Sequence, residues 1–509
     1  MLRALQSLLF CAILLGGLGW AHHPAHAQPK RLTLALGTVP QTLDPRRASS
    51  PTELDLAELI YESLVAPNRQ NQWVPQLAER WDRIGETEYW VTLKAGIWFH
   101  DGTAFTAAQV KSAFDELQGS PGFPRFRQLA DSFAACEVVD ERTVRFLLHE
   151  PLPESGFLHA LHFPIFKHRS LSNQKSGRPI GSGPFILVRR SASELVLRRH
   201  WYYHGTAPDV KDLHFQLLPD AKTRIRGLLS EDTALAGNVV SFRELPKLRT
   251  PAAQRKFRLV EEAGATYRHL VFNTEHAALQ DVRVRQALAL AVQREELLAL
   301  LTKNHARLAT GVFPAEHAFH AASKEFSYAP EDAKKRLDEA GYRRTNGKRL
   351  QLRLATRNQK EDNRLATLLA DQLGRVGIQV TVTRFGRQSF QRVLAGGDYD
   401  LVLRQTRVPG NPEALNGLFH SSQTPERGGR NYARYRNPQL DALLASARRE
   451  SNHAQRKAIY QQAQQILSEE LPHLPLWHGN HLALVSRQVE GYRFHPAGVF
   501  HALRTLRVN

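Results

Sequence analysis

Alternating apolar and polar positions mark several short strands along the chain. The alternation is clear in RLTLAL, residues 31–36, and it returns in residues 350–354 and 378–382. A period of two is typical of strands that bury one face. Between the last two strands, leucines recur at helical spacing over residues 365–373 and the pattern stops at Gly377. Strand, helix and strand at this spacing predict a βαβ unit, and therefore a parallel sheet, in the second half of the chain.

Helices are predicted where apolar periodicity coincides with start and stop signals. Thr106, with Gln109 three residues later, forms a capping box ahead of an apolar helical face. Pro330 is suited to the first turn of another helix, and Gly341 is suited to its end. Further helices predicted from the apolar pattern cover residues 53–64, 281–301 and 456–467.

The segment YDLVLRQTRVPGNP, residues 399–412, begins as a strand and ends as a loop broken by Gly and Pro. Arg404, Gln405 and Arg407 lie where the strand pattern gives way to the loop. In open α/β folds, ligands gather just beyond the carboxyl ends of strands. We therefore predict that this segment lines a ligand cleft. The alternative is an ordinary surface loop with solvated arginines.

The first 27 residues have the features of a cleaved signal peptide. Arg3 supplies the positive charge, residues 8–18 form an apolar stretch too short to span a bilayer, and Ala25-His26-Ala27 ends in the small-x-small pattern. Gln28 is then the mature N-terminus. Cys11 lies inside the apolar stretch, which argues against a lipid-anchored protein. We expect an exported protein that is not a lipoprotein.

Composition and charge narrow the function classes. The chain has 509 residues, about 480 of them after residues 1–27, which implies two or three domains. The net charge of +19 would suit a nucleic-acid partner. However, no run of five or more basic residues occurs, and the arginines do not alternate with aromatics, so we exclude that partner. Only Cys136 remains after cleavage, and we expect a buried, inert thiol.

Seven segments, in order along the chain, resemble the periplasmic solute-binding proteins of peptide/nickel ABC transporters, the dipeptide- and oligopeptide-type extracellular solute-binding proteins of family 5. The segments are GIWFHDGTAFTAAQVKSAFDEL, PIGSGPFILVRR with LRRHWYYHG, VFNTEHAALQDVRVRQALALAV, APEDAKKRLDEAGY, YDLVLRQTRVPGNP, RYRNPQLDALLASA and AIYQQAQQILSEELPHLPLW.

This resemblance implies an α/β fold: a two-lobed periplasmic-binding-protein clamshell (type II, cluster C-like) with an extra subdomain inserted in lobe I. Carried onto this chain, the inserted subdomain is residues 64–160 and lobe II is residues 266–477. Lobe I combines residues 28–63, 161–265 and 478–509. The chain then crosses between the lobes twice, near residues 268–272 and 474–477, which is a hinge suited to clamshell closure.

The resemblance also implies a function. The protein is expected to be the periplasmic substrate-binding component of an ABC importer, which captures a small solute between its lobes and delivers it to a permease and its ATPase. It is expected to act as a monomer, with no catalytic residues, cofactor or metal of its own. The alternatives are a hydrolase or a ligand-sensing protein on the same fold. No GxSxG or HExxH motif supports a hydrolase. His420 is a candidate contact for a metal chelate, so a chelate is an alternative transported solute.

The segment 399–412 departs from the family's pattern. Peptide binders carry W-x-x-D before the Asn/Asp-Pro, and the aspartate pairs with the peptide's ammonium group. Counting back from Pro412, the aspartate position falls on Val408, which offers no carboxylate. Arginines stand nearby instead, which favours an anionic or amine-blocked, peptide-like ligand. The predicted ligand-binding residues are Arg404, Gln405, Arg407 and Val408, with Val39 and Pro40 facing them from lobe I.

Overall fold

The computed structural model describes residues 31–38, 40–48, 50–69, 72–119, 132–167, 179–237, 245–408, 412–495 and 498–508. The predicted signal peptide, Val39 and the loop residues 409–411 lie outside the described residues.

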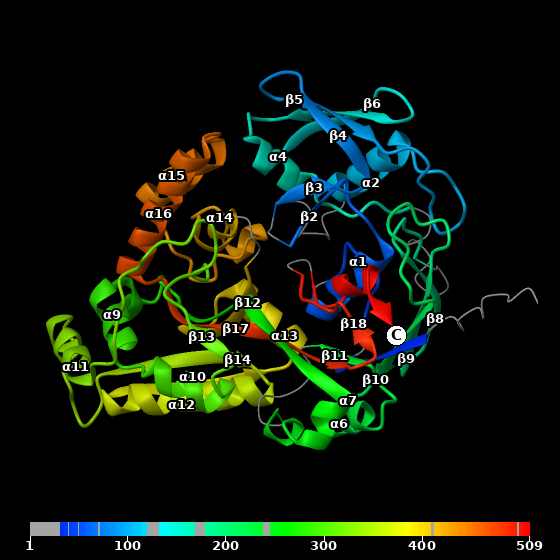
Figure 1. Ribbon diagram of the computed structural model, residues 1–509. Coiled ribbons are helices and arrows are strands. Elements are labelled where there is room, and N and C mark those ends of the chain that lie inside the picture. Colours follow the sequence, from blue (N-terminus) through cyan, green and yellow to red (C-terminus); the bar gives the residue numbers. More distant parts are fainter. Residues whose placement is uncertain are drawn as a thin grey trace, which may run out of the picture.

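One 11-stranded sheet runs through both lobes of the molecule, across the lower part of the view in Figure 1. In spatial order its strands are β15 (Ile378–Phe385), β14 (Leu350–Arg357), β16 (Leu401–Arg407), β12 (Phe257–Phe272), β17 (His473–Ser486), β11 (Leu235–Gly237), β1 (Arg31–Leu36), β10 (Asp212–Leu217), β9 (Glu194–Arg199) and β8 (Phe185–Arg190), with β13 (Ala306–Leu308) paired to β17.

The long strands β12 and β17 connect the two lobes. They pair antiparallel from Phe257 opposite Ser486 to Val271 opposite His473. On one side, β17 adjoins β11 and, beyond it, β1 and β8–β10, the strands predicted for lobe I. On the other side, β12 adjoins β16 and, beyond it, β14 and β15, the strands predicted for lobe II. The two predicted crossing segments are therefore neighbouring parts of one strand pair.

Lobe II contains the predicted βαβ unit. β14 and β15 pair in parallel, with α12 (Lys360–Arg375) between them in sequence. β14 also pairs in parallel with β16. Leu365, Leu369 and Leu373 are buried, as the leucine spacing predicts. The other helices of this lobe are α8 (Ala277–Gln280), α9 (Val282–Leu290), α10 (Arg294–Thr302), α11 (Pro330–Glu339), α13 (Arg387–Gly396), α14 (Ala414–Phe419), α15 (Pro438–Arg449) and α16 (His453–Glu470).

A smaller antiparallel sheet forms the inserted subdomain, at the top of Figure 1. Its strands, in spatial order, are β4 (Ala78–Arg83), β5 (Glu88–Leu93), β7 (Thr143–Leu148) and β6 (Phe133–Val138). The helices α2 (Ala107–Gly119) and α4 (Glu154–Ala160) pack with it. The backbone N–H of Thr106 donates to Oε1 of Gln109 at 2.8 Å, immediately before α2 begins. The predicted start signal is therefore confirmed.

The remaining elements lie in lobe I, at the start of the inserted subdomain and near the C-terminus. The helices are α1 (Pro51–Ile60), α6 (Ala221–Leu229) and α7 (Pro251–Lys256). The short strands are β2 (Val65–Pro67), β3 (Trp73–Pro75), β18 (Val489–Glu490) and β19 (Arg507–Val508).

Two predicted helices have different bounds in the structure. The single helix expected over residues 281–301 is wrong, because it is divided into α9 and α10. The backbone N–H of Gln293, at the break, donates to Oε1 of Gln372 instead of continuing the helix. The helix expected over residues 53–64 starts earlier and ends at Ile60. It stops there because Tyr61 is extended and Glu62 forms a β-bridge with Ile165.

Candidate functional site

The strand β16 carries three of the predicted site residues, Arg404, Gln405 and Arg407, and Val408 follows it directly. Side chains alternate along a strand, so Arg404 and Val408 point to one face while Gln405 and Arg407 point to the other. On the first face, Val402 joins the core cluster that contains Phe390 and Phe419. On the second face, Leu401 and Leu403 join the core cluster that contains the α12 leucines. The alternation therefore gives the two arginines different surroundings.

Arg404 is a half-buried cation held between two aromatic rings. Its guanidinium carbon lies 4.6 Å from the centre of the Tyr432 ring and 5.8 Å from that of Phe390. Cation–π contacts of this kind hold a guanidinium in place without neutralising it. Its Nε is buried and has no hydrogen-bond partner among the described residues. The side chain is thus fixed in position while its hydrogen-bonding capacity is not fully used.

The electrostatic surroundings of Arg404 are positive. Burial lowers the pKa of Arg404, and the charges of Arg357 and Arg430 lower it further. Asp362, the carboxylate that pairs with Arg357, is already committed: it accepts from Arg268 Nη2 at 2.6 Å and from Arg357 Nε at 3.1 Å. An anion bound beside Arg404 would offset the cost of burying its charge and the repulsion from the neighbouring arginines.

Gln405 takes part in a hydrogen-bond network on the opposite face. Its Oε1 accepts from Nη1 of Arg268 at 3.3 Å, and the residue is exposed. Gln405 therefore does not lie beside Arg404, although the two are adjacent in sequence.

Arg407 reaches from lobe II to lobe I. Its Nη1 lies 3.5 Å from Oδ1 of Asp55, a buried residue of α1. Asp55 also accepts the backbone N–H of Val499 at 3.0 Å. Burial raises the pKa of Asp55 to about 7, although the charge of Arg407 acts to lower it. Arg407 thus joins the two lobes through a carboxylate that is costly to bury in its charged form.

The other described site residues lie in the protein interior. Val408 is 2% exposed and packs in the same cluster as Tyr435 and Phe419. Pro40 is also buried, and its carbonyl accepts from Nη2 of Arg190 at 3.0 Å. The structure brings neither side chain against Arg404. Their roles in ligand binding stay predictions.

Sequence reasoning missed three residues that define this region: Phe390, Tyr432 and Asp55. The two aromatics come from separate segments, and nothing local in the sequence associates them with Arg404. Asp55 could have been suspected, since it is an acidic residue on the apolar helix pattern of residues 53–64. An acidic residue in that setting needs a partner, but the sequence did not identify Arg407 as that partner.

Other candidate sites find structural explanations. His420 Nδ1 accepts the backbone N–H of Ser422 at 3.1 Å, so this histidine is engaged in a local turn. Cys136 is buried, and burial raises the pKa of its thiol to about 12, in keeping with the inert thiol expected. Among the described residues, no cluster of three or more His, Cys, Asp or Glu side chains could hold a metal ion. Within the same part of the chain, no helix has the length and apolar character needed to cross a membrane.

Several known proteins are similar to this chain over nearly its whole length. The di/tripeptide-binding protein 2 of Pseudomonas aeruginosa (strain UCBPP-PA14) is 27% identical over 508 residues, covering 92% of this chain and 93% of that protein. The dipeptide-binding protein of Escherichia coli (strain K12) is 25% identical over 513 residues, covering 94% of each.

Solved structures show the same fold. NikA from Brucella suis, in complex with Fe(III)-EDTA, superposes with a TM-score of 0.83 at 23% identity, covering 94% of this chain and all of that one. The oligopeptide-binding protein AppA from Bacillus subtilis, in complex with a nonapeptide, gives a TM-score of 0.82 at 22% identity, covering 94% of this chain and 99% of that one. The predicted two-lobed α/β fold is therefore confirmed.

A family model extends the comparison from fold to function. The model of the bacterial extracellular solute-binding proteins, family 5, matches residues 72–426. This match confirms the predicted solute-binding role. The chain belongs to the bacterial extracellular solute-binding proteins of family 5.

Proposed function

We propose that this protein is the periplasmic substrate-binding component of an ABC importer and that it captures an anionic, amine-blocked, peptide-like solute between its lobes. It passes the solute to a membrane permease with its ATPase, acts as a monomer and carries out no chemistry on the solute. The signal peptide predicted over residues 1–27 would direct it to the periplasm. The dipeptide- and di/tripeptide-binding relatives support the peptide-like part of the proposal.

The domain assignment follows from the same proposal. Lobe I is residues 28–63, 161–265 and 478–509, the inserted subdomain is residues 64–160, and lobe II is residues 266–477. The strand pair β12 and β17 supports the boundaries near 266 and 477, since it passes from one lobe to the other there. The four-stranded sheet within residues 78–148 supports an inserted subdomain.

The observation that carries the ligand proposal is the setting of Arg404. A guanidinium fixed by Tyr432 and Phe390, with an unpartnered Nε and cationic neighbours, favours a bound anion. The groups that act most on the pKa of Arg404 are tyrosines and arginines, not carboxylates. Asp55 is already engaged by Arg407 and the Val499 N–H.

A matched ligand pair tests this proposal. Isothermal titration calorimetry would compare Ala-Ala with N-acetyl-Ala-Ala, which share a carboxylate and differ only in the blocked amine. We expect the acetylated peptide to bind at least about 10-fold more tightly, because an ammonium group would be desolvated without a carboxylate partner. Native mass spectrometry of protein purified from its periplasm should detect a bound ligand. After release by unfolding, this ligand should be anionic and should not react with amine reagents. Tighter binding of free Ala-Ala, or release of a free-amino peptide, would overturn the ligand class.

A further inference from the structure

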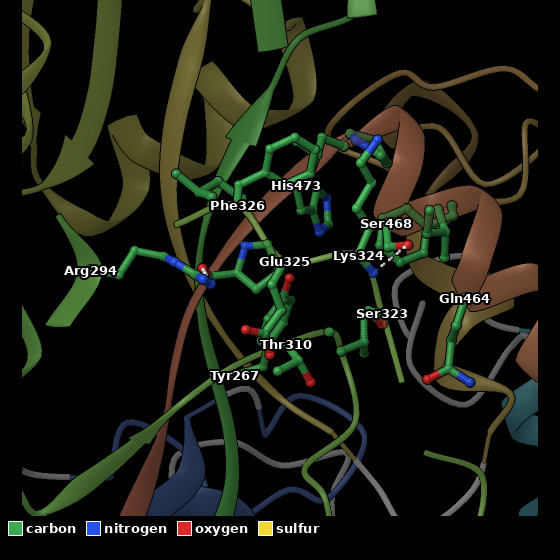
Figure 2. Close-up of a pocket in the computed structure, with 18 residues that line it drawn as sticks. Tyr267, Arg294, Thr310, Ser323, Lys324, Glu325, Phe326, Gln464, Ser468 and His473 are labelled. Carbon is green, nitrogen blue, oxygen red and sulfur yellow. Dashed lines mark hydrogen bonds between the residues drawn. The ribbon is translucent and has the colours of Figure 1, made fainter. Parts of the chain in front are cut away.

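A cavity lies inside lobe II, and none of the predicted ligand-binding residues lines it. Its volume is about 40 Å³. All of the residues that line it fall between residues 267 and 475, so lobe I does not contribute to it. Figure 2 shows Tyr267, Arg294 and His473 around this space, with Lys324 and Ser468 beside them. A cavity of this size holds about three water-sized groups of atoms.

Arg294 supplies positive charge and unused donors to the cavity. The residue is 7% exposed, and its Nη1 donates to the carbonyls of Ala309 at 3.0 Å and Pro475 at 3.1 Å. Its Nε and Nη2 have no partner among the described residues. These two donors are not sealed inside the protein, so they are open to an acceptor that enters the cavity.

Tyr267 supplies a hydroxyl donor. The residue is 1% exposed, and its hydroxyl forms no hydrogen bond with the described residues. Burial raises the pKa of Tyr267, so the phenol keeps its proton. The ring is fixed by stacking on His269, with centroids 4.2 Å apart. The hydroxyl therefore remains available to donate to a bound group.

His473 lines the cavity as a neutral ring and offers no open donor. The residue is 4% exposed, and both ring nitrogens are buried without a hydrogen-bond partner among the described residues. Burial and the charge of Arg404 lower the pKa of His473 to about 3, so the ring is neutral and carries one N–H. Leaving such a ring unsatisfied costs about 1–3 kcal/mol.

We infer that this cavity is an accessory binding site for a small carboxylate, of the size of formate or acetate. Arg294 and Tyr267 bring to one small space donors that have no partner among the described residues, and the neutral ring of His473 lines the same space. Lys324, at the exposed edge of the cavity, adds a second positive charge. Glu325 also lies at this edge and opposes an anion, but its carboxylate is exposed and therefore screened by solvent.

Formate itself is the probe that tests the site. A ligand that binds the folded protein alone raises its stability, so thermal unfolding would be followed with sodium formate and with sodium chloride at equal ionic strength. The variants are Tyr267→Phe, which removes one donor and keeps the stacked ring, and Tyr342→Phe, a matched loss of a hydroxyl outside the cavity.

We expect formate to raise the melting temperature of the wild type and of Tyr342→Phe more than chloride does. For Tyr267→Phe we expect formate affinity to fall about 5- to 10-fold, the effect of one charge-assisted hydrogen bond. A crystal structure with formate should place the carboxylate between Arg294 and Tyr267. An equal effect of formate and chloride, an unchanged response in Tyr267→Phe, or water alone in the cavity would overturn the inference.

Discussion

Two arginines that look equivalent in the sequence have different environments in the structure. Arg404 and Arg407 are three positions apart on β16, so their side chains leave opposite faces of the strand. Arg404 meets Tyr432 and Phe390 and has no anionic partner among the described residues, whereas Arg407 pairs with Asp55 of the other lobe. This difference supports the proposal that Arg404 recognises the ligand and that Arg407 helps to bring the lobes together.

At the residue scale, replacing Arg404 by Gln is expected to weaken binding of an anionic ligand by about 10- to 100-fold. A hydrogen bond to a charged group contributes about 1.5–3 kcal/mol, and Gln cannot supply the charge. The measurement is calorimetric titration with N-acetyl-Ala-Ala. The control is Arg375→Gln, because Arg375 is an exposed arginine that pairs with Asp371 on α12. Equal affinities of the Arg404→Gln variant and the wild type would remove Arg404 from the ligand site.

At the element scale, the strand pair β12 and β17 determines how the lobes are joined. The pairing shifts register between Glu262 and Thr266, and Gly264 lies in this irregular stretch. A Cβ atom at Gly264 would lie 2.2 Å from the carbonyl oxygen of Gly479 on β17. The two backbones therefore approach so closely that only glycine fits at this point of the connection between the lobes.

Substituting Gly264 by Ala is expected to destabilise the protein by about 1–3 kcal/mol, as overpacking against a backbone atom does. Gly479→Ala is the matched control, since a Cβ there has no heavy atom within 4 Å. Urea denaturation of both variants gives the comparison. The explanation fails if the two variants lose the same stability.

At the scale of the whole molecule, contacts between distant segments hold the lobes and the subdomain together. Besides the pair of Arg407 with Asp55, Arg387 of α13 lies 3.9 Å from Glu53 of α1. Arg456 of α16 also donates to the hydroxyl of Ser155 in α4 of the subdomain. Each contact joins a cation of lobe II to a group of another part of the chain, so lobe II closes on its neighbours through arginine side chains.

Asp55 should make the stability of this arrangement depend on pH. Its folded pKa, about 7, lies above its ordinary value of 3.8, because burial and the charge of Glu58 outweigh Arg407 and the Val499 N–H. The folded protein therefore retains a proton that the unfolded chain releases. The resulting stability is full below about pH 4 and is lost as the pH rises through 7.

Asp55→Asn removes this titration while keeping a side-chain oxygen for the Val499 N–H. Between pH 4 and 8, the free energy of unfolding of the wild type is expected to fall by about 4 kcal/mol more than that of the variant. Urea denaturation across this pH range measures the difference. Parallel pH profiles for the two proteins would show that Asp55 is not the titrating group.

Periodicity in the sequence determined the elements, and through them the fold class. The recurring apolar residues of 350–354, 365–373 and 378–382 predicted a parallel βαβ unit, and β14, α12 and β15 confirm it. Such patterns are local, because a strand or an amphipathic helix must bury the face on which its apolar residues recur. Helix ends were less predictable: the break between α9 and α10 depends on Gln372, far away in the chain.

The candidate site was only partly accessible from the sequence. Residues 399–412 lack the carboxylate of the family's pattern and carry Arg404 and Arg407 instead, and this local difference predicted the two arginines as site residues. The tertiary structure alone decided what each arginine meets, because Tyr432, Phe390 and Asp55 come from separate segments. A charge acquires its role from the partners and the burial that folding gives it, and neither is encoded in its immediate neighbours.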